Sequence, residues 1–292
     1  MNFLLFTIWT LGRGFNAVYT KKAQKMTDNT YGNSIKFVFY YALFQLIILL
    51  CIPPYKHIPI RLDFIIYPVL FGVFYIISYI MLFMALGNGP TALTNVVYTF
   101  HTIIPMISGI LLWNESISEV QAAGIVLAAI SVYLFYKSVK KENEKELSLK
   151  WLIYVIIATV AIGIAVVFTQ SFAKMYPDMN KQYLTIYTIT SAVLSLIFLL
   201  TSKKTKDVGK NKPEYFKYFI YILIASICQN IVNIVFMYFI NLIPSTVLFP
   251  TINCIYILTF IVMGRIFFKE KLNKLSFIGV CSSIFSLILL NL

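Results

Sequence analysis

Charged residues are scarce in this chain of 292 residues. They make up 12% of the sequence, whereas apolar residues make up 60% and the mean hydropathy is +0.82. Soluble domains carry roughly 25% charged residues, so a chain with so few cannot cover its apolar side chains with polar surface. The composition therefore excludes an ordinary globular protein and indicates that lipid is the solvent.

The sequence also lacks the short motifs of common enzymes. It has no GxSxG, HExxH, CxxC or Walker A pattern, and its two histidines, His57 and His101, cannot form a zinc site alone. The cysteines show neither metal nor disulfide spacing and are interpreted as packing residues: Cys51, Cys228, Cys254 and Cys281. We expect no enzyme, no metal and no cofactor. The basic charge clusters in loops between apolar runs, so we expect no nucleic acid partner either.

Long apolar runs dominate the chain. A helix needs about 20 mostly apolar residues to cross a bilayer. Ten runs qualify, at residues 3–20, 33–52, 64–86, 91–113, 119–137, 151–173, 182–201, 216–240, 246–268 and 275–292. Pro105 and Pro250 fall inside two of them and can bend those helices. The runs predict an all-α integral membrane protein with ten transmembrane helices.

One membrane unit occurs twice. Shifting residues 86–137 by 155 positions lays them over 241–292 without a gap. Identical residues then coincide at Thr91 and Thr246, Leu93 and Leu248, Gly109 and Gly264, Glu115 and Glu270, Gly124 and Gly279, Ser131 and Ser286, and Leu134 and Leu289. Duplicated membrane segments are typical of transporters whose halves rock around a shared site.

The duplication predicts two repeats of five helices each, residues 1–137 and 151–292, joined by a charged linker at 138–150. Because each repeat holds an odd number of spans, the second is inverted relative to the first. Most lysines lie in loops after odd-numbered runs, and the opposite side holds only Lys56, Arg61, Lys174 and Lys181. The positive-inside rule therefore places both termini outside the cytoplasm.

The segment from Pro90 through Glu115 to Gly124, echoed by the segment from Ser245 to Gly279, resembles the EamA-type repeat of the drug/metabolite transporter superfamily. The resemblance covers essentially the whole chain. It implies a secondary transporter whose central cavity is lined mainly by spans 1, 3, 4, 6, 8 and 9. It also implies cytoplasmic termini, which is the opposite of what the lysine distribution indicates. We expect a multi-pass protein of the cell membrane, specifically a prokaryotic inner membrane.

Only two ionisable side chains lie well inside predicted spans. Arg13 could clamp a carboxylate or phosphate with two parallel hydrogen bonds, or could instead extend toward the boundary near Lys21. His101 could couple protons, because an unperturbed imidazole titrates near pH 6.5, or could be a neutral residue satisfied by a neighbouring helix.

Uncharged polar residues recur along several spans. They form a stripe on span four, an amide cluster on span eight, a tyrosine pair on span three and, through the 155-residue shift, equivalent positions on span nine. The candidates for substrate binding are Arg13, Tyr75, Tyr79, Asn95, Tyr98, His101, Gln170, Gln229, Asn230, Asn233, Asn253 and Tyr256. The alternative is that these groups only hydrogen bond neighbouring helices together.

No Asp or Glu lies in the middle of a span, which argues against cation–proton exchange through a central carboxylate. Glu115 and Glu270 fall at turns, where we expect them to cap a helix or to pair with Lys271 or Lys274.

The favoured hypothesis is a secondary-active transporter of a small polar metabolite, such as an amino acid or another carboxylated compound, that works by alternating access. The alternative is a carrier of a quaternary amine or another organic cation, held by aromatic rings such as Trp9 and Tyr98. Since no nucleotide-binding motif is present, we expect proton or exchange coupling, and a monomer or homodimer in the bilayer.

Overall fold

The computed structural model describes residues 2–52, 62–89, 91–142, 148–201, 214–268 and 274–290. Most of these residues are helical, and no strand is found among them. The elements are α1 (Asn2–Lys25), α2 (Tyr31–Leu50), α3 (Leu62–Asn88), α4 (Thr91–Thr99), η1 (Phe100–Thr102), α5 (Ile103–Trp113), α6 (Glu119–Glu142), α7 (Leu149–Met175), η2 (Pro177–Met179), α8 (Asn180–Thr201), α9 (Tyr215–Leu242), α10 (Ser245–Phe268) and α11 (Lys274–Leu290). The turn that contains Glu270 and Lys271 lies outside the described residues.

Five stretches of the described chain are long and apolar enough to cross a membrane. They are Tyr31–Leu50, Asp63–Asn88, Leu149–Met175, Pro177–Thr201 and Tyr215–Leu242, and shorter apolar helices cover Val97–Trp113, Glu119–Ser131 and Phe277–Leu290. Local capping fixes some of the starts: Ser148 Oγ accepts a hydrogen bond from Trp151 N at 3.2 Å where α7 begins.

The fourth predicted span is not one continuous α-helix. A 3₁₀ turn, η1, separates α4 from α5. Pro105 explains the break, because its ring has no N–H and would clash with the carbonyl of His101 four residues earlier. Gly163 of α7 lies against this turn, where an added Cβ would be 3.1 Å from His101 O. The close approach therefore brings the η1 backbone onto α7.

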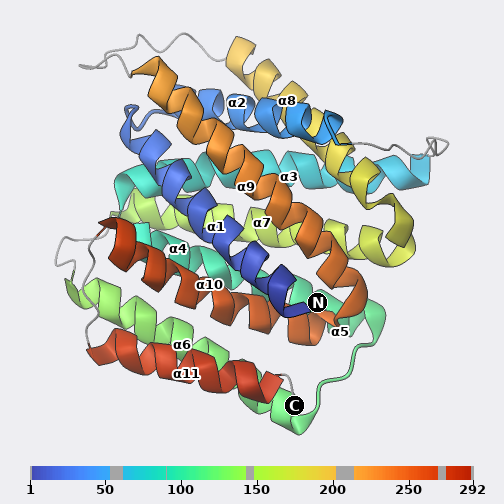
Figure 1. Ribbon diagram of the computed structural model, residues 1–292, viewed down its shortest axis with the longest axis vertical. Helices are drawn as coiled ribbons and strands as arrows, with labels where there is room; N and C mark the ends of the chain where they lie inside the picture. Colours follow the sequence, from blue (N-terminus) through green and yellow to red (C-terminus); the bar gives the residue numbers. More distant parts are fainter. Residues whose placement is uncertain are drawn as a thin grey trace.

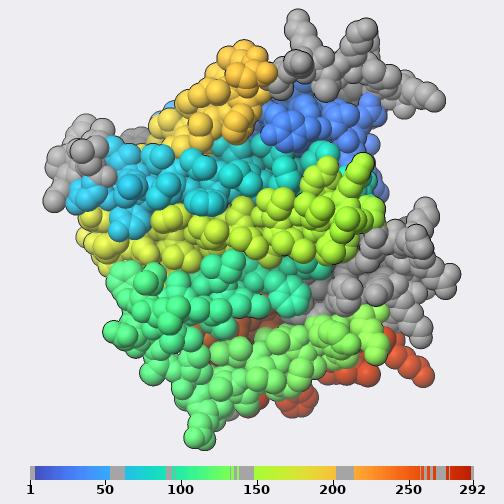
Figure 2. Space-filling view, turned by 180° about the vertical axis from the view of Figure 1, so that it is seen from behind, coloured from blue at the N-terminus to red at the C-terminus, as the bar shows by residue number. Residues whose placement is uncertain are grey.

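The helices run roughly side by side across Figure 1, with α2 and α8 at one edge and α6 and α11 at the other. Between them α3 packs along α7, and α1 packs along α9. Figure 2 shows α3 and α7 adjacent on the opposite face of the molecule. In the duplicated sequence α7 corresponds to α1 and α9 to α3, so the two pairs are counterparts of each other.

The edge pair α6 and α11 shows the duplication in its hydrogen bonds. Ser131 Oγ donates to Gly279 O at 2.9 Å, and Ser286 Oγ donates to Gly124 O at 2.7 Å. The 155-residue shift converts each bond into the other. Small residues and serine hydroxyls are the usual means by which membrane helices approach closely. This packing therefore displays the two-repeat architecture.

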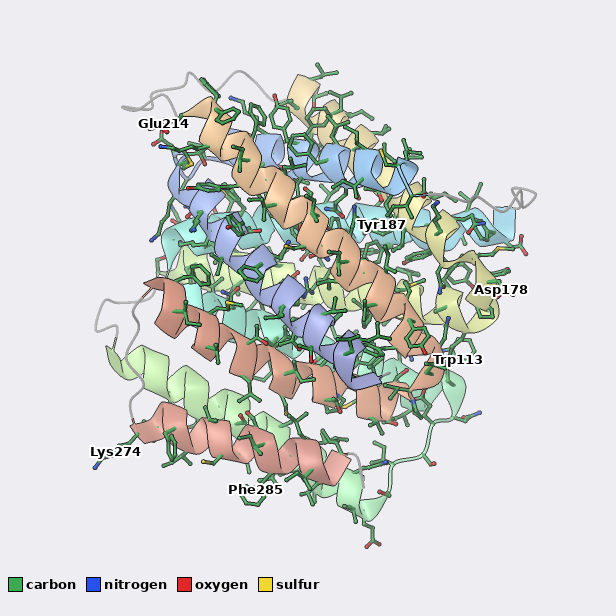
Figure 3. All side chains as sticks on the ribbon, in the orientation of Figure 1. Trp113, Asp178, Tyr187, Glu214, Lys274 and Phe285 are labelled. Carbon is green, nitrogen blue, oxygen red and sulfur yellow. The ribbon has the colours of Figure 1, made fainter. Side chains whose placement is uncertain are left out.

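The bundle has two chemically different ends. Figure 3 shows Trp113 and Asp178 at one end, which we call the Glu115 end after the turn that follows Trp113. Glu214 and Lys274 lie at the other, which we call the lysine-rich end because α1 also finishes there with Lys21, Lys22 and Lys25. Helix α1 begins, and α11 finishes, at the Glu115 end, near the N and C marks in Figure 1.

Candidate functional site

Arg13 lies near the middle of α1 and is held by two other helices. Its Nε donates to the hydroxyl of Tyr256 on α10, and its Nη1 donates to Gln229 Oε1 on α9 at 3.0 Å. The guanidinium carbon also lies 4.9 Å from the centre of the Tyr256 ring, a cation–π distance. Three helices therefore position one half-buried cation.

Gln229 is the hub of the surrounding network. Its Oε1 accepts from Arg13 and, at 3.3 Å each, from the hydroxyls of Tyr41 on α2 and Tyr79 on α3. Its side-chain amide donates to Asn233 Oδ1 at 2.8 Å. Gln229 is only 3% exposed, so its hydrogen-bonding groups must find protein partners or a bound solute.

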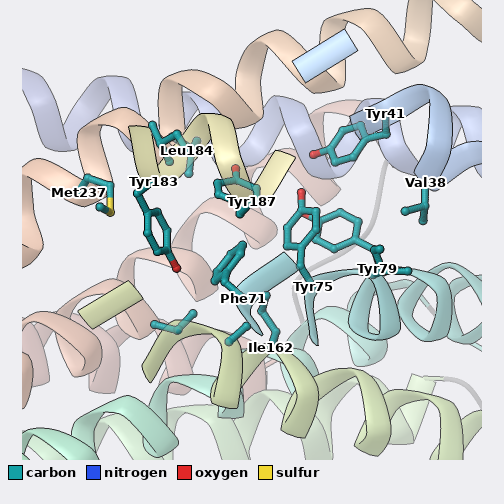
Figure 4. Close-up of a cluster of buried hydrophobic side chains, with 14 of the residues drawn as sticks. Val38, Tyr41, Phe71, Tyr75, Tyr79, Ile162, Tyr183, Leu184, Tyr187 and Met237 are labelled. Atoms are coloured by element: carbon teal, nitrogen blue, oxygen red, sulfur yellow. The ribbon is translucent and has the colours of Figure 1, made fainter. Parts of the chain in front are cut away.

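The network continues away from Arg13 through tyrosines. Asn233 Nδ2 donates to the hydroxyl of Tyr187 on α8, which lies 3.5 Å from Gln45 Oε1 on α2. Gln45 Nε2 donates to the Tyr75 hydroxyl at 3.4 Å. Figure 4 shows the hydroxyls of Tyr41, Tyr75 and Tyr187 directed into one region. The tyrosine rings that carry these hydroxyls pack against one another, and the ring centres of Tyr75 and Tyr79 are 4.4 Å apart.

His101 sits in the η1 turn and is 5% exposed. Its Nδ1 lies 2.7 Å from Tyr98 O, and because a carbonyl oxygen only accepts, Nδ1 carries the hydrogen. Nε2 is then the ring atom left for a proton or a solute. The ring centre is 6.3 Å from that of Tyr256, so the imidazole lies beside the tyrosine that binds Arg13.

Two cavities meet at Arg13. We call the first the aromatic cavity, lined by side chains that include Trp9, Phe71, Tyr75, Tyr183, Tyr187 and Phe249. The space between its side chains, together with the part that opens outward, is about 660 Å³. The second has a mostly apolar lining, and we call it the polar cavity after the side chains of Asn16, Thr20, Asn95 and Thr99 in that lining. Both share Arg13, Tyr79, Tyr98, His101 and Tyr256.

A separate charged contact lies at the Glu115 end, in the turn between α5 and α6. Lys174 of α7 forms an ion pair with Glu115, whose other oxygen accepts from Thr246 N at 2.9 Å, in the first turn of α10. Burial alone raises the pKa of Glu115, but the hydrogen bonds from Lys174 and from the backbone of Thr246 and Ser245 outweigh it, so the pKa falls below its ordinary value. The predicted capping role is therefore present, with Lys174 rather than Lys271 or Lys274 as the partner.

Comparisons with known proteins identify the family of this chain. The model of the EamA-like transporter family matches residues 3–137 and again residues 149–292. The chain belongs to this family. Family membership identifies it as a multi-pass membrane transporter of the drug/metabolite transporter superfamily, in agreement with the resemblance stated above.

A solved structure described simply as "Crystal structure of protein" shares its fold with this EamA-like transporter. The TM-score is 0.69 at 11% identity, and the match covers 98% of this chain and 94% of the other. At that identity the likeness shows the fold alone. None of the curated proteins matches the chain significantly.

The structure brings most of the predicted site residues together around the two cavities. The aromatic cavity is lined by Arg13, Tyr75, Tyr79, Tyr98, His101, Gln229, Asn233 and Tyr256, and Asn95 lines the polar cavity. Three predicted residues line neither. Gln170 accepts from Ser108 at 2.8 Å and donates to Ser245 at 2.6 Å, Asn230 donates to Gln45 O at 3.0 Å, and Asn253 is buried on α10. Gln170 and Asn230 hold helices together, which is the alternative interpretation of such residues.

Helix α8 contributes to the site although neither the polar pattern nor the resemblance singled out span seven. Tyr183 and Tyr187 both line the aromatic cavity. Their spacing of four residues repeats the Tyr75–Tyr79 pattern on α3, and this spacing is the signal that could have identified them. Tyr41 was also missed, and it reaches the site through Gln229.

Proposed function

We propose that this EamA-like protein is a secondary-active transporter of a small, polar, carboxylate-bearing metabolite. The observation that supports this most directly is Arg13, a cation in the middle of the bundle at the meeting point of two cavities. A cation in this position is costly in a membrane unless it serves a partner or a solute.

The hydrogen bonds of Arg13 leave some of its N–H groups available to such a solute. A guanidinium presents five N–H donors in a planar fork. Tyr256 and Gln229 take one N–H each, on Nε and Nη1. No hydrogen bond within the described part of the chain takes the remaining N–H groups of Nη1 and Nη2. That pair of nitrogens is the edge that binds a carboxylate with two parallel bonds.

The charge of the cavities favours an anion over an organic cation. Among the described residues, no Asp or Glu lines either cavity, so Arg13 is the dominant charge that they place in the shared space. Like charges a few ångströms apart repel strongly in a site of low polarity. The aromatic rings could surround a quaternary amine, but the guanidinium among them opposes that alternative.

In this proposal ten helices span the bilayer as two inverted repeats of five, and alternating access moves the solute past Arg13. The lysine-rich end faces the cytoplasm, because short cytoplasmic loops carry the excess of Lys and Arg. His101, which lines both cavities together with Arg13, couples transport to protons through Nε2. Labelling of Lys25→Cys from the inside only, and of Asp178→Cys from the outside only, would support the orientation, and the reverse pattern would refute it.

The substrate class is tested by thermal shift of the purified protein against carboxylates, sugars, nucleosides and quaternary amines. A solute that binds the folded state raises the melting temperature by mass action. We expect shifts from carboxylates that disappear in Arg13→Gln, and retention of part of the shift in Arg13→Lys, which keeps the charge but not the fork. Shifts from quaternary amines alone would overturn the proposal.

A further inference from the structure

The two cavities follow one another along α1 and α3. On α1, Trp9 lines the aromatic cavity, Arg13 lines both, and Thr20 lines the polar cavity. On α3, Tyr75 lines the aromatic cavity, and Tyr79, one turn later, lines both cavities. The polar cavity is therefore the one nearer the lysine-rich end, and the layer that contains Arg13 separates it from the aromatic cavity.

The polar cavity has the chemistry of a binding site of its own. Thr20 is 7% exposed, and its hydroxyl has no hydrogen-bond partner within the described residues. A buried hydroxyl without a partner is unfavourable, so one that lines a cavity is available to hydrogen bond a bound solute. The half-buried Asn95 adds an amide from α4.

We propose that the polar cavity is a second binding site for a carboxylate-bearing solute, in which Arg13 binds the carboxylate while Thr20 and Asn95 bind its hydroxyl or amide groups. This inference rests on the proposed function and extends it from one site to two consecutive sites. The solute reaches the second site without releasing its carboxylate, because the same guanidinium borders both cavities.

The test uses a variant without the four native cysteines, into which Thr20→Cys is introduced. The probes are two methanethiosulfonates of similar size, one carrying a sulfonate and one a trimethylammonium group, with rates normalised to a free thiol in solution. We expect the sulfonate to react at Thr20→Cys roughly tenfold faster than the cation, because Arg13 attracts it. Adding Arg13→Gln should abolish that preference.

Two controls make the result specific to the cavity. Thr27→Cys lies at the same end, beyond α1, and should show a much weaker preference, since only surface lysines act on it. Ala17→Cys lines the same cavity and replaces Thr20→Cys if that variant does not fold. A preference no larger than that at Thr27→Cys, or one that survives Arg13→Gln, would overturn the proposal.

The outcome also separates this inference from the proposed function. If glycerate, which has a carboxylate and two hydroxyls, protects Thr20→Cys from labelling, the second site is supported. A sulfonate preference without binding of any carboxylate in the thermal-shift panel would refute the carboxylate substrate and leave an anion site in the polar cavity. Carboxylate binding that requires Arg13, without the preference at Thr20→Cys, would refute the second site alone.

Discussion

Replacing Glu115 by Gln should destabilise the protein through one identifiable contact. The carboxylate joins three helices: it pairs with Lys174 of α7, accepts from the first turn of α10, and sits after α5 in the turn to α6. Gly109 leaves space for it, because an added Cβ there would be 2.8 Å from Glu115 Oε2. The glutamine has the same shape, so the change removes the charge without creating a cavity.

The expected loss is about 2 kcal/mol. A hydrogen bond to a charged group is worth about 1.5–3 kcal/mol, and a negative charge at a helix N-terminus adds about 0.3–1 kcal/mol. Because a glutamine can still accept a hydrogen bond from Thr246 N, part of this stabilisation is retained in the variant. The Glu115 side chain is 10% exposed, so solvent screens the pair less than at an open surface. In a chain of 292 residues, 2 kcal/mol lowers the melting temperature by about 3 °C.

The same contact predicts a dependence on pH. The pKa of Glu115 in the folded protein lies below its ordinary value of 4.5. Its stabilising contribution is therefore complete above pH 4.5 and is lost as the pH falls through the lower, folded pKa. The difference in melting temperature between wild type and Glu115→Gln should shrink as the pH is lowered from 7 to below 4.5.

The assay is thermal unfolding in detergent, followed by tryptophan fluorescence at several pH values. Glu119→Gln is the matched control, because Glu119 is exposed in the first turn of α6 and its loss should change the melting temperature by less than about 2 °C. Equal effects of the two variants, or a Glu115→Gln effect that does not change with pH, would refute the reasoning.

Three further predictions concern single side chains. Tyr256→Phe removes one hydrogen-bond partner of Arg13. It should weaken carboxylate binding roughly fivefold in titrations, which is equivalent to about 1 kcal/mol. An unchanged affinity would exclude a role of Tyr256 in positioning Arg13. Gln229→Leu removes the acceptor shared by Arg13 Nη1 and the hydroxyls of Tyr41 and Tyr79, while Arg13 keeps its bond to Tyr256, and should lower stability by about 3 kcal/mol in thermal unfolding. The loss should exceed that of Asn230→Leu, which removes one hydrogen bond to Gln45 O. Ser131→Ala and Ser286→Ala remove the two counterpart hydrogen bonds, and each should lower the free energy of unfolding by about 0.6 kcal/mol. A large difference between the two variants would show that the two repeats do not contribute equally to the α6–α11 contact.

The sequence predicted the helices better than it predicted the site. Helix ends agree with the apolar runs to within a few residues because the bilayer requirement acts on each segment separately. Which face of a helix meets a cavity depends on its rotation against its neighbours, and polarity alone does not fix that rotation. Adjacent residues on α9 show this, since Gln229 lines the aromatic cavity and Asn230 bonds to α2. The Lys174 partner of Glu115 depends on tertiary packing, which no local pattern encodes.

The duplication explains why one arginine can border both cavities. The 155-residue shift maps His101 onto Tyr256. In the folded chain these two rings meet edge-on, with centres 6.3 Å apart, within the layer that both cavities share. Counterpart residues of two inverted repeats meet only close to the axis that relates the repeats. Arg13 is bonded to Tyr256 and so also lies near that axis. In the proposed transport mechanism a single cation at this point borders both cavities, so it can contact the solute on either side, and a second cation on the other repeat is not required.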